Sequence, residues 1–342
     1  MPKPVHPFVR IVRAAFRPVH TVQALSLRVE ILWFALRNRF GNSPVSTGKP
    51  GTVVSLTTYG KRIHSVYLTI ESIARGEVLP SRLVLWLDDA TLFDALPPTL
   101  LRLKRRGLEI RLCKDYGPHK KYFPYLESQE VLTEPLATAD DDIIYPSSWL
   151  AGLVRARELF PNVVNSYRAR VVTLRGWKLA PYREWKLRQS TEASYRTIAT
   201  GVSGVIYPQA FQRELKLAGT GFLDCCPKAD DLWLHVQAMR AGFPVRQIQP
   251  KPLHFPFVPG TQDVTLWAEN WEKGTDGNDR QAAATYNESD LAILCPGSGA
   301  PHEFELSPQF SKDPQALAPK RGSDQPQEQE DQWSPRFNST TL

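Results

Sequence analysis

The sequence predicts an α/β fold with a doubly wound, mainly parallel sheet and helices on both of its faces. From about residue 50 onward, short apolar runs alternate with segments of helical periodicity. Strands that alternate with helices pair mainly in parallel, because each helix returns the chain to the same edge of the sheet. The chain has 342 residues, of which 42% are hydrophobic, so it can bury one large core of this type or two ordinary ones.

The expected elements follow one another over a core domain at about residues 50–256. Strands are expected at 52–57, 83–87, 108–112, 136–139, 163–167 and 204–207, and helices at 66–74, 99–106 and 232–240. Residues 257–305 are expected to form an extension that packs on this domain. Residues 306–342 are rich in Pro, Gln, Ser, Glu and Asp, a composition that buries little apolar surface and predicts a disordered tail.

Residues 1–46 form a separate basic segment. They contain seven Lys and Arg residues and one acid, Glu30, so they hold most of the formal net charge of +7. Apolar residues at helical spacing from Val22 to Phe40 predict an amphipathic helix, which contacts either an anionic membrane surface or the protein itself. Arginines interrupt its apolar stretches, so we expect no bilayer-spanning helix, which would need about 20 apolar residues.

The composition also predicts where the protein works. The four cysteines, at positions 113, 225, 226 and 295, show neither a C-x-x-C pair nor zinc-ligand spacing, which indicates reduced thiols. No nucleic-acid-binding motif accompanies the basic charge. We therefore expect a cytoplasmic protein, which is peripheral on the inner membrane face if the N-terminal helix contacts lipid and not the protein.

Three consecutive carboxylates, Asp140, Asp141 and Asp142, stand where an apolar strand ends. Ligands of open α/β sheets bind at the carboxyl ends of strands, and side chains two apart on extended backbone share a face. Asp140 and Asp142 can therefore reach one cation together, and their hard oxygen atoms suit Mg²⁺ or Mn²⁺. The alternative is an exposed acidic turn, although like charges beside the apolar residues 143–145 favour a compensating cation.

Two further acids, Asp230 and Asp231, begin an expected helix after Pro227. An aspartate in the first turn of a helix is often only a cap that satisfies backbone N–H groups. The functional alternative is a general base that removes a proton from an acceptor hydroxyl.

Two other segments contain candidate ligands. Lys120, followed by Lys121, comes after a Gly-Pro turn and is either a phosphate contact or part of a solvated basic turn. His254 lies among apolar residues and is either a further metal ligand or a core histidine.

Five segments in this order resemble motifs of bacterial GT-A-fold glycosyltransferases that are related to the family 2 transferases and build surface polysaccharides. They are residues 54–59 with 62–63, 117–121, 138–146, 201–208 and 229–234. Each motif is weak by itself, whereas the ordered set is specific. The resemblance covers about residues 50–280.

The resemblance implies a hexosyltransferase that uses a nucleotide-sugar donor, a glycan or lipid-linked acceptor and Mn²⁺ or Mg²⁺, with inversion, in surface polysaccharide or lipopolysaccharide biosynthesis. It assigns the base to Asp231, or to its neighbour Asp230. The metal would be held by Asp140 and Asp142, with His254 as the additional candidate. The residues expected to border the donor are Thr57, Tyr59, Arg62, Lys120, Asp140, Asp141 and Gly204.

Two other functions fit the fold less well. A metal-dependent nucleotidyltransferase would need a glycine-rich phosphate loop after the first strand, where residues 57–62 contain only Gly60. A catalytically silent module that binds polysaccharide or membrane would be expected to lack one acidic site, whereas both are present.

Overall fold

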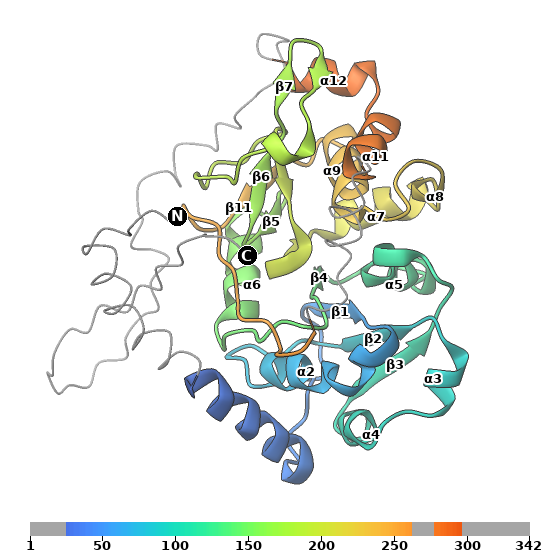
Figure 1. Ribbon diagram of the computed structural model, residues 1–342, viewed down its shortest axis with the longest axis vertical. Helices are drawn as coiled ribbons and strands as arrows, with labels where there is room; N and C mark the ends of the chain where they lie inside the picture. Colours follow the sequence, from blue (N-terminus) through green and yellow to red (C-terminus); the bar gives the residue numbers. More distant parts are fainter. Residues whose placement is uncertain (1–24, 262–276, 296–342) are drawn as a thin grey trace, which may run out of the picture. The chain divides into compact units, whose positions relative to one another are not determined.

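The computed structural model describes residues 25–261 and 277–295, which belong to one compact unit of the chain. A seven-stranded sheet forms its centre (Figure 1). Its strands in spatial order are β11 (Val245–Gln247), β5 (Val164–Ser166), β10 (Val205–Tyr207), β4 (Leu136–Thr138), β1 (Val53–Thr57), β2 (Leu83–Leu87) and β3 (Leu108–Leu112). Only β10 runs antiparallel to its neighbours, so the predicted mainly parallel sheet is confirmed.

Helices cover both faces of the sheet, as the sequence predicts. Alternate strand residues feed two separate cores, because successive side chains point to opposite faces: Val53 belongs to one core and Val54 to the other. The first core contains residues of α5 (Phe123–Ser128), α7 (Gln209–Ala218) and α9 (Asp230–Arg240), and the second contains residues of α2 (Val66–Ala74), α4 (Pro98–Arg105) and α6 (Trp149–Leu159).

The predicted element positions agree closely with those observed. β2, β3 and α2 have the expected bounds, and the other predicted strands and helices differ by one or two residues at an end. The shorter elements are α3 (Ala90–Asp94), α8 (Phe222–Cys225) and the 3-10 helices η1 (Gly60–His64), η2 (Gly117–Lys121), η3 (Tyr182–Glu184) and η4 (Gly201–Ser203). Two small antiparallel sheets pair β6 (Ala169–Val171) with β9 (Thr197–Ala199) and β7 (Leu174–Arg175) with β8 (Lys178–Leu179).

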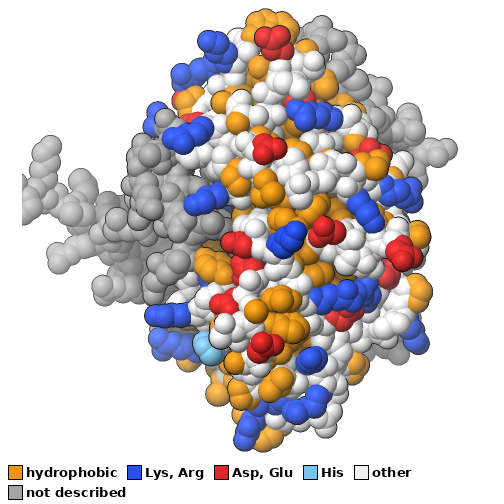
Figure 2. All heavy atoms as spheres, turned by 90° about the vertical axis from the view of Figure 1, so that its right-hand side faces the viewer, with side chains coloured by type: hydrophobic (Ala, Val, Ile, Leu, Met, Phe, Trp, Pro, Cys, Tyr) orange, Lys and Arg blue, Asp and Glu red, His pale blue; other side chains and the backbone are white. Residues whose placement is uncertain are grey.

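The region beyond the predicted core domain contains α11 (Gly277–Thr285) and α12 (Glu288–Leu294), and both contact α9. Arg240 of α9 forms an ion pair with Asp290, at 2.7 Å between Nη2 and Oδ2. The predicted tail at 306–342 lies outside the described residues. On the face shown in Figure 2, basic and acidic side chains are intermixed with apolar patches, so this face is not a uniformly basic surface.

A helix at residues 25–40 packs beside α2 (Figure 1). Phe34 is fully buried in a small apolar cluster with Leu68, Ile144 and Val258. Arg37 donates a hydrogen bond to the Ala74 carbonyl at the end of α2, at 2.7 Å. Over its described part the segment predicted from Val22 to Phe40 is helical, and one of its faces packs on the domain.

Candidate active site

The acidic run follows β4 at the carboxyl edge of the sheet, where β1 also ends. Asp141 is buried and tied to the end of β1, because Thr58 Oγ1 donates to its Oδ2 at 2.6 Å. Arg62 of η1 donates from Nη1 to Oδ1 of the same carboxylate at 2.8 Å. Thr69 of α2 donates to the backbone carbonyl of Asp141 at 2.9 Å. Residues from three separate segments therefore fix the position of the run.

Asp142 shares the Arg62 guanidinium, with Nη2 lying 3.2 Å from its Oδ2. Burial, together with the charges of Asp140 and Asp141, raises the pKa of the Asp142 carboxyl to about 6. Arg62 and Lys121 act in the opposite direction. The run is therefore only partly neutralised by its own cations.

The two adjacent lysines of η2 point to different partners. Lys120, the donor-binding residue that the sequence suggested first, forms ion pairs with Asp88 and with Asp115, the latter at 2.8 Å. Lys121 contacts Asp140, and its Nζ lies 4.0 Å from Asp230 Oδ2. Lys121, not Lys120, is thus the lysine located at the acidic run. Adjacent residues on a short 3-10 turn point in different directions, and no sequence pattern shows which of them points to the acidic run. The sequence alone therefore does not distinguish Lys120 from Lys121.

Lys121 is held in place by contacts between η2 and the loop before α9. The His119 ring stacks on Phe222 at a centroid distance of 3.9 Å, and its Nε2 lies 2.9 Å from the Cys226 carbonyl oxygen. Gly117 has a φ of 57°, and a Cβ there would lie 2.7 Å from the Pro227 carbonyl oxygen. Glycine is therefore required where the two segments meet.

The second acidic pair begins α9, opposite Lys121. Asp231 Oδ1 accepts a hydrogen bond from the Gly201 backbone N–H at 3.0 Å. The cap position of α9 is Ala229, and no side-chain cap hydrogen bond is present there. Asp231 is thus bound to another segment of the chain, not to the free N–H groups of its own helix, which argues against the interpretation as a simple cap.

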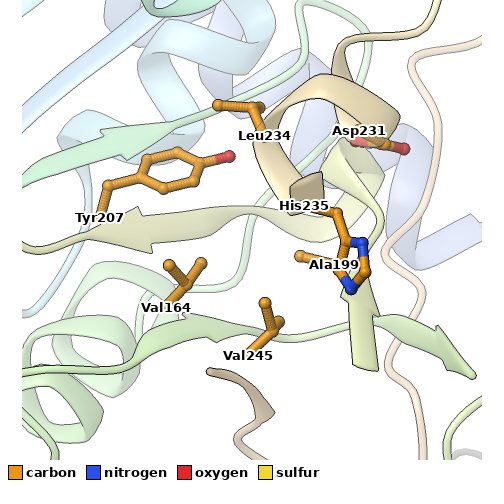
Figure 3. Close-up of a pocket in the computed structure, with 7 residues that line it drawn as sticks. All are labelled: Val164, Ala199, Tyr207, Asp231, Leu234, His235 and Val245. Carbon is orange, nitrogen blue, oxygen red and sulfur yellow. The ribbon is translucent and has the colours of Figure 1, made fainter. Parts of the chain in front are cut away.

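The surroundings of Asp231 favour its protonated form. Burial raises the pKa of this carboxyl to about 8, with a further contribution from the charge of Asp230, whereas Lys121 and the Gly201 N–H lower it. Asp231 also lines a small cavity, together with the side chains of Tyr207 and His235 (Figure 3). The other lining residues are apolar: Val164, Ala199, Leu234 and Val245.

Gly204, which the resemblance places beside the donor, and the nearby Gly201 have different surroundings. A Cβ on Gly204 would lie 2.5 Å from Trp149 Nε1, so this glycine is required for packing in the core. A Cβ on Gly201 would lie 3.5 Å from both Asp231 Oδ1 and Lys121 Nζ. Gly201 therefore borders the acidic site, whereas Gly204 lies against the side chain of a buried tryptophan.

The remaining predicted residues lie at the edge of this site or away from it. Thr57 donates a hydrogen bond from Oγ1 to the Trp86 carbonyl at 3.1 Å, and the Arg62 guanidinium lies 5.4 Å from the Tyr59 ring centroid. His254 is exposed and contacts the Phe257 ring at a centroid distance of 4.9 Å. Its interpretation as a buried core histidine is therefore wrong.

Across residues 25–261 and 277–295, no three His, Cys, Asp or Glu side chains converge into a set that could hold a metal ion. The structure thus does not assemble Asp140, Asp142 and His254 into one ligand group. Five carboxylates, those of the acidic run and of Asp230 and Asp231, nevertheless surround the two cations Arg62 and Lys121. The chemistry of this donor set fits a hard divalent cation, because Mg²⁺ is commonly bound by only one or two carboxylates together with substrate phosphates.

Comparison with known proteins does not assign the chain to a family. No protein-family model and no curated protein matches the sequence. Among solved structures, the chain is similar to GalNAc-T7 with UDP, GalNAc and Mn²⁺ (13% identity, TM-score 0.42, covering 63% of this chain and 45% of that one). It is also similar to the mannosyltransferase PcManGT from Pyrobaculum calidifontis with GDP-Man and Mn²⁺ (15% identity, TM-score 0.40, covering 73% of this chain and 70% of that one).

A third similar structure is a CMP:2-keto-3-deoxy-manno-octonic acid synthetase complexed with CTP (11% identity, TM-score 0.36, covering 58% of this chain and 88% of that one). The matches thus include both sugar transfer and nucleotide-sugar synthesis. At scores and identities this low they do not establish an activity, which must be argued from the residues of the site.

Proposed function

We propose that the chain is a glycosyltransferase that moves a sugar from a nucleotide-sugar donor to an acceptor hydroxyl, with Asp231 as the general base. The observation that carries this proposal is the position of Asp231. Its half-buried carboxylate is held by the Gly201 amide and lies within the electrostatic reach of Lys121, which contacts Asp140 at the end of the sheet. A proton acceptor and an acidic run at the carboxyl edge are thereby combined in one site.

The proposed step is an inverting displacement. Asp231 takes the proton of the acceptor hydroxyl while its oxygen attacks the anomeric carbon of the donor sugar. The bond from that carbon to the diphosphate oxygen breaks, and the nucleoside diphosphate leaves with the electron pair. A carboxyl with a pKa near 8 is a stronger base than an ordinary aspartate, which is the property that this role requires.

The donor diphosphate would bring further negative charge to a site in which carboxylates already outnumber cations. Arg62 and Lys121 offset part of this charge. Mn²⁺ or Mg²⁺ would be held by Asp140 and Asp142, and when bound it would offset the charge of the diphosphate. We further propose that the sugar is a hexose and that the acceptor is a glycan or is lipid-linked, as in surface polysaccharide or lipopolysaccharide biosynthesis. This part of the proposal rests on the resemblance of the sequence motifs to those of enzymes of that type.

The direct test is a screen of purified full-length protein against nucleotide-sugars with Mn²⁺, in which release of the nucleoside diphosphate is measured. We expect release from one class of donor. Pyrophosphate released from a nucleoside triphosphate and a sugar phosphate would indicate a nucleotidyltransferase instead. No turnover of any donor, together with no donor-induced rise in melting temperature, would contradict the proposal.

We also propose that the helix at residues 25–40 attaches the protein to an anionic membrane surface. Its outward face exposes six large apolar side chains, at 46% to 73% exposure: Leu25, Val29, Leu32, Trp33, Leu36 and Phe40. Exposed Arg28 and Arg39 lie on the same helix, and residues 1–24 add four basic residues and no acid. Apolar burial and attraction to lipid phosphates would then act together. None of the helices described is long and apolar enough to cross a membrane.

Sedimentation with vesicles tests this attachment. Full-length protein is expected to pellet with vesicles that contain phosphatidylglycerol and less with phosphatidylcholine alone. The double variant Leu32→Ser, Leu36→Ser should lose most of this binding, whereas Leu217→Ser should retain it, since Leu217 is 81% exposed on α7. Equal pelleting of both variants would contradict a role for the helix face.

A further inference from the structure

We propose that Arg168 and Arg170 form an anion-binding site beside Asp231, and that this site holds an acidic group of the acceptor, a carboxylate or a phosphate. The inference rests on the proposed glycosyl transfer and adds a substrate class to it. The sequence motifs assign neither arginine.

The two arginines lie at the start of β6. Their spacing places both side chains on one face of the extended segment, since strand residues two apart share a face. Arg168 Nη1 donates to Thr200 Oγ1 at 3.0 Å. Arg170 Nη1 donates to the Trp185 carbonyl at 2.6 Å, and its guanidinium lies 5.5 Å from the Tyr182 ring centroid. These contacts orient both guanidinium groups.

The arginines are linked to the proposed base through two consecutive residues. Thr200 binds Arg168 through its side chain, and Gly201 binds Asp231 through its backbone N–H. Burial lowers the pKa of Arg168 and the charge of Arg170 lowers it further, whereas Tyr182 and Asp231 raise it. Arg168 therefore interacts electrostatically with the carboxylate that is proposed to take the acceptor's proton.

Neither arginine has an acidic partner of its own. Over residues 25–261 and 277–295, no ion pair joins Arg168 or Arg170 to a carboxylate, whereas Arg62, Arg82 and Arg106 each have one. Two partly buried like charges without a counter-ion are costly. An incoming carboxylate or phosphate would remove this cost, and the planar guanidinium suits both groups.

The residues around Arg168 and Arg170 favour an anion that belongs to the acceptor and not to the donor. Lys121 and the acidic run lie together and are assigned to the donor, whereas Arg168 and Arg170 lie close enough for the charge of Arg170 to lower the pKa of Arg168. Partial desolvation of its otherwise exposed ring lowers the pKa of His254, and the charge of Arg168 lowers it further. A divalent cation is disfavoured next to that arginine, which gives a physical reason why His254 is not assembled with Asp140 and Asp142.

The test is a titration of three sugars onto the full-length protein, followed by NMR: methyl glucuronide, glucose 6-phosphate and methyl glucoside. We expect at least one of the two anionic sugars to bind tenfold or more tightly than the neutral glucoside, and the tighter of the two identifies the acidic group. In the double variant Arg168→Gln, Arg170→Gln this preference should disappear. Arg183→Gln, at an exposed arginine of the same region, should retain it.

Two outcomes would overturn the proposal. One is equal binding of all three sugars, or a preference that persists in the double variant. The other is weaker binding of the nucleotide-sugar in the double variant, which would put the arginines on the donor side. If the double variant does not fold, Arg168→Lys is used, because it keeps the charge, loses the planar fork and should weaken anion binding without abolishing it. Slow hydrolysis of the donor by water is measured in parallel, since its absence in the parent would contradict the glycosyltransferase proposal and not the anion site.

Discussion

The acidic run at Asp140–Asp142 and the acidic pair at Asp230 and Asp231 consist of the same residue type in different surroundings. In the run, Asp141 and Asp142 share the Arg62 guanidinium, and Asp140 contacts Lys121. In the pair, Asp231 is held by one backbone amide, and burial raises its pKa to about 8.

This difference separates charge binding from proton transfer. The Asp142 carboxyl, with Arg62 and Lys121 nearby, has a pKa of about 6, so it is largely ionised at pH 7 and suits cation binding, whereas the Asp231 carboxyl, with a pKa of about 8, suits the exchange of a proton. Lys121 joins the two groups, since it contacts Asp140 and lies 4.0 Å from Asp230. Substitutions in the acidic run should therefore change donor binding, whereas substitution of Asp231 should change the transfer step.

The largest expected effect is that of Asp231→Asn. Transfer to the acceptor should fall by a factor of about 100 or more, because general-base catalysis typically contributes that much. Donor binding should stay close to that of the parent, since Asn Oδ1 can still accept the Gly201 N–H. Both quantities are measured on one preparation by product release and by titration of the donor.

The matched control for this substitution is Asp89→Asn. Asp89 is a true cap, since its side chain accepts from the backbone N–H groups of Thr91 and Leu92, at 2.8 and 3.2 Å. Asn caps about as well as Asp, so this variant should keep full activity. Near-parent transfer by Asp231→Asn would move the base to Asp230 or indicate a retaining reaction.

The second prediction concerns the run. Asp142→Asn, or EDTA with the parent protein, should weaken donor binding about tenfold or more, because a hard cation loses its carboxylate ligand or is removed. Circular dichroism checks that the variant keeps its fold. Donor binding that is unchanged in EDTA would show that Arg62 and Lys121 offset the diphosphate charge unaided.

The third prediction compares the two lysines. Lys121→Met should weaken donor binding about tenfold, since loss of the cation at Asp140 leaves more unbalanced negative charge there. Lys120→Met should leave donor binding nearly unchanged, because Lys120 pairs with Asp88 and Asp115 instead. The opposite ranking would restore Lys120 as the donor-binding residue.

These two lysines also show how far the sequence predicts the molecule. Alternation of apolar runs identified six of the seven strands of the sheet, because burial on both faces leaves a strong periodic signal. The edge strand β11 and the helices α5, α6 and α7 were not predicted. Side-chain direction leaves no such signal in a 3-10 turn. Lys121 faces the acidic run because His119 and Gly117 fix η2 against residues about 107 positions later in the chain.

The glycines and arginines illustrate the same limit. Gly204 and Gly201 are three residues apart, yet only the fold shows that Trp149 lies against the first and Asp231 against the second. Arg168 and Arg170 belong to no recognised motif. They are candidates for anion binding because, among the described residues, neither has a carboxylate partner. Composition alone does not show this.

The fourth prediction is the pH dependence of transfer. Asp231 must be deprotonated to act as a base, so the rate at fixed saturating substrate should rise up to about tenfold per pH unit below pH 8 and level off above it. Donor binding should be constant from pH 7 to 9, because it depends on the run, where the pKa of Asp142 is about 6. A rate that is flat from pH 6 to 9 would contradict a base with a raised pKa.

The last expected effect is on stability, and it has a definite sign. The folded protein holds a proton on Asp231 up to about pH 8, whereas an unfolded aspartate releases it near pH 3.9. Between these values the folded state binds more protons, so the stability contribution of Asp231 falls as the pH rises from about 4 to 8 and is fully lost above 8. Asn has no such proton. The free energy of unfolding of Asp231→Asn should therefore increase relative to the parent between pH 5 and pH 8 and change little above that range.

Chemical denaturation of both proteins at pH 5, 7 and 9 measures this difference, with Asp89→Asn as the variant in which it should stay constant. A constant difference for Asp231→Asn would mean that Asp231 is ionised throughout, and the two acidic groups would then have the same protonation state.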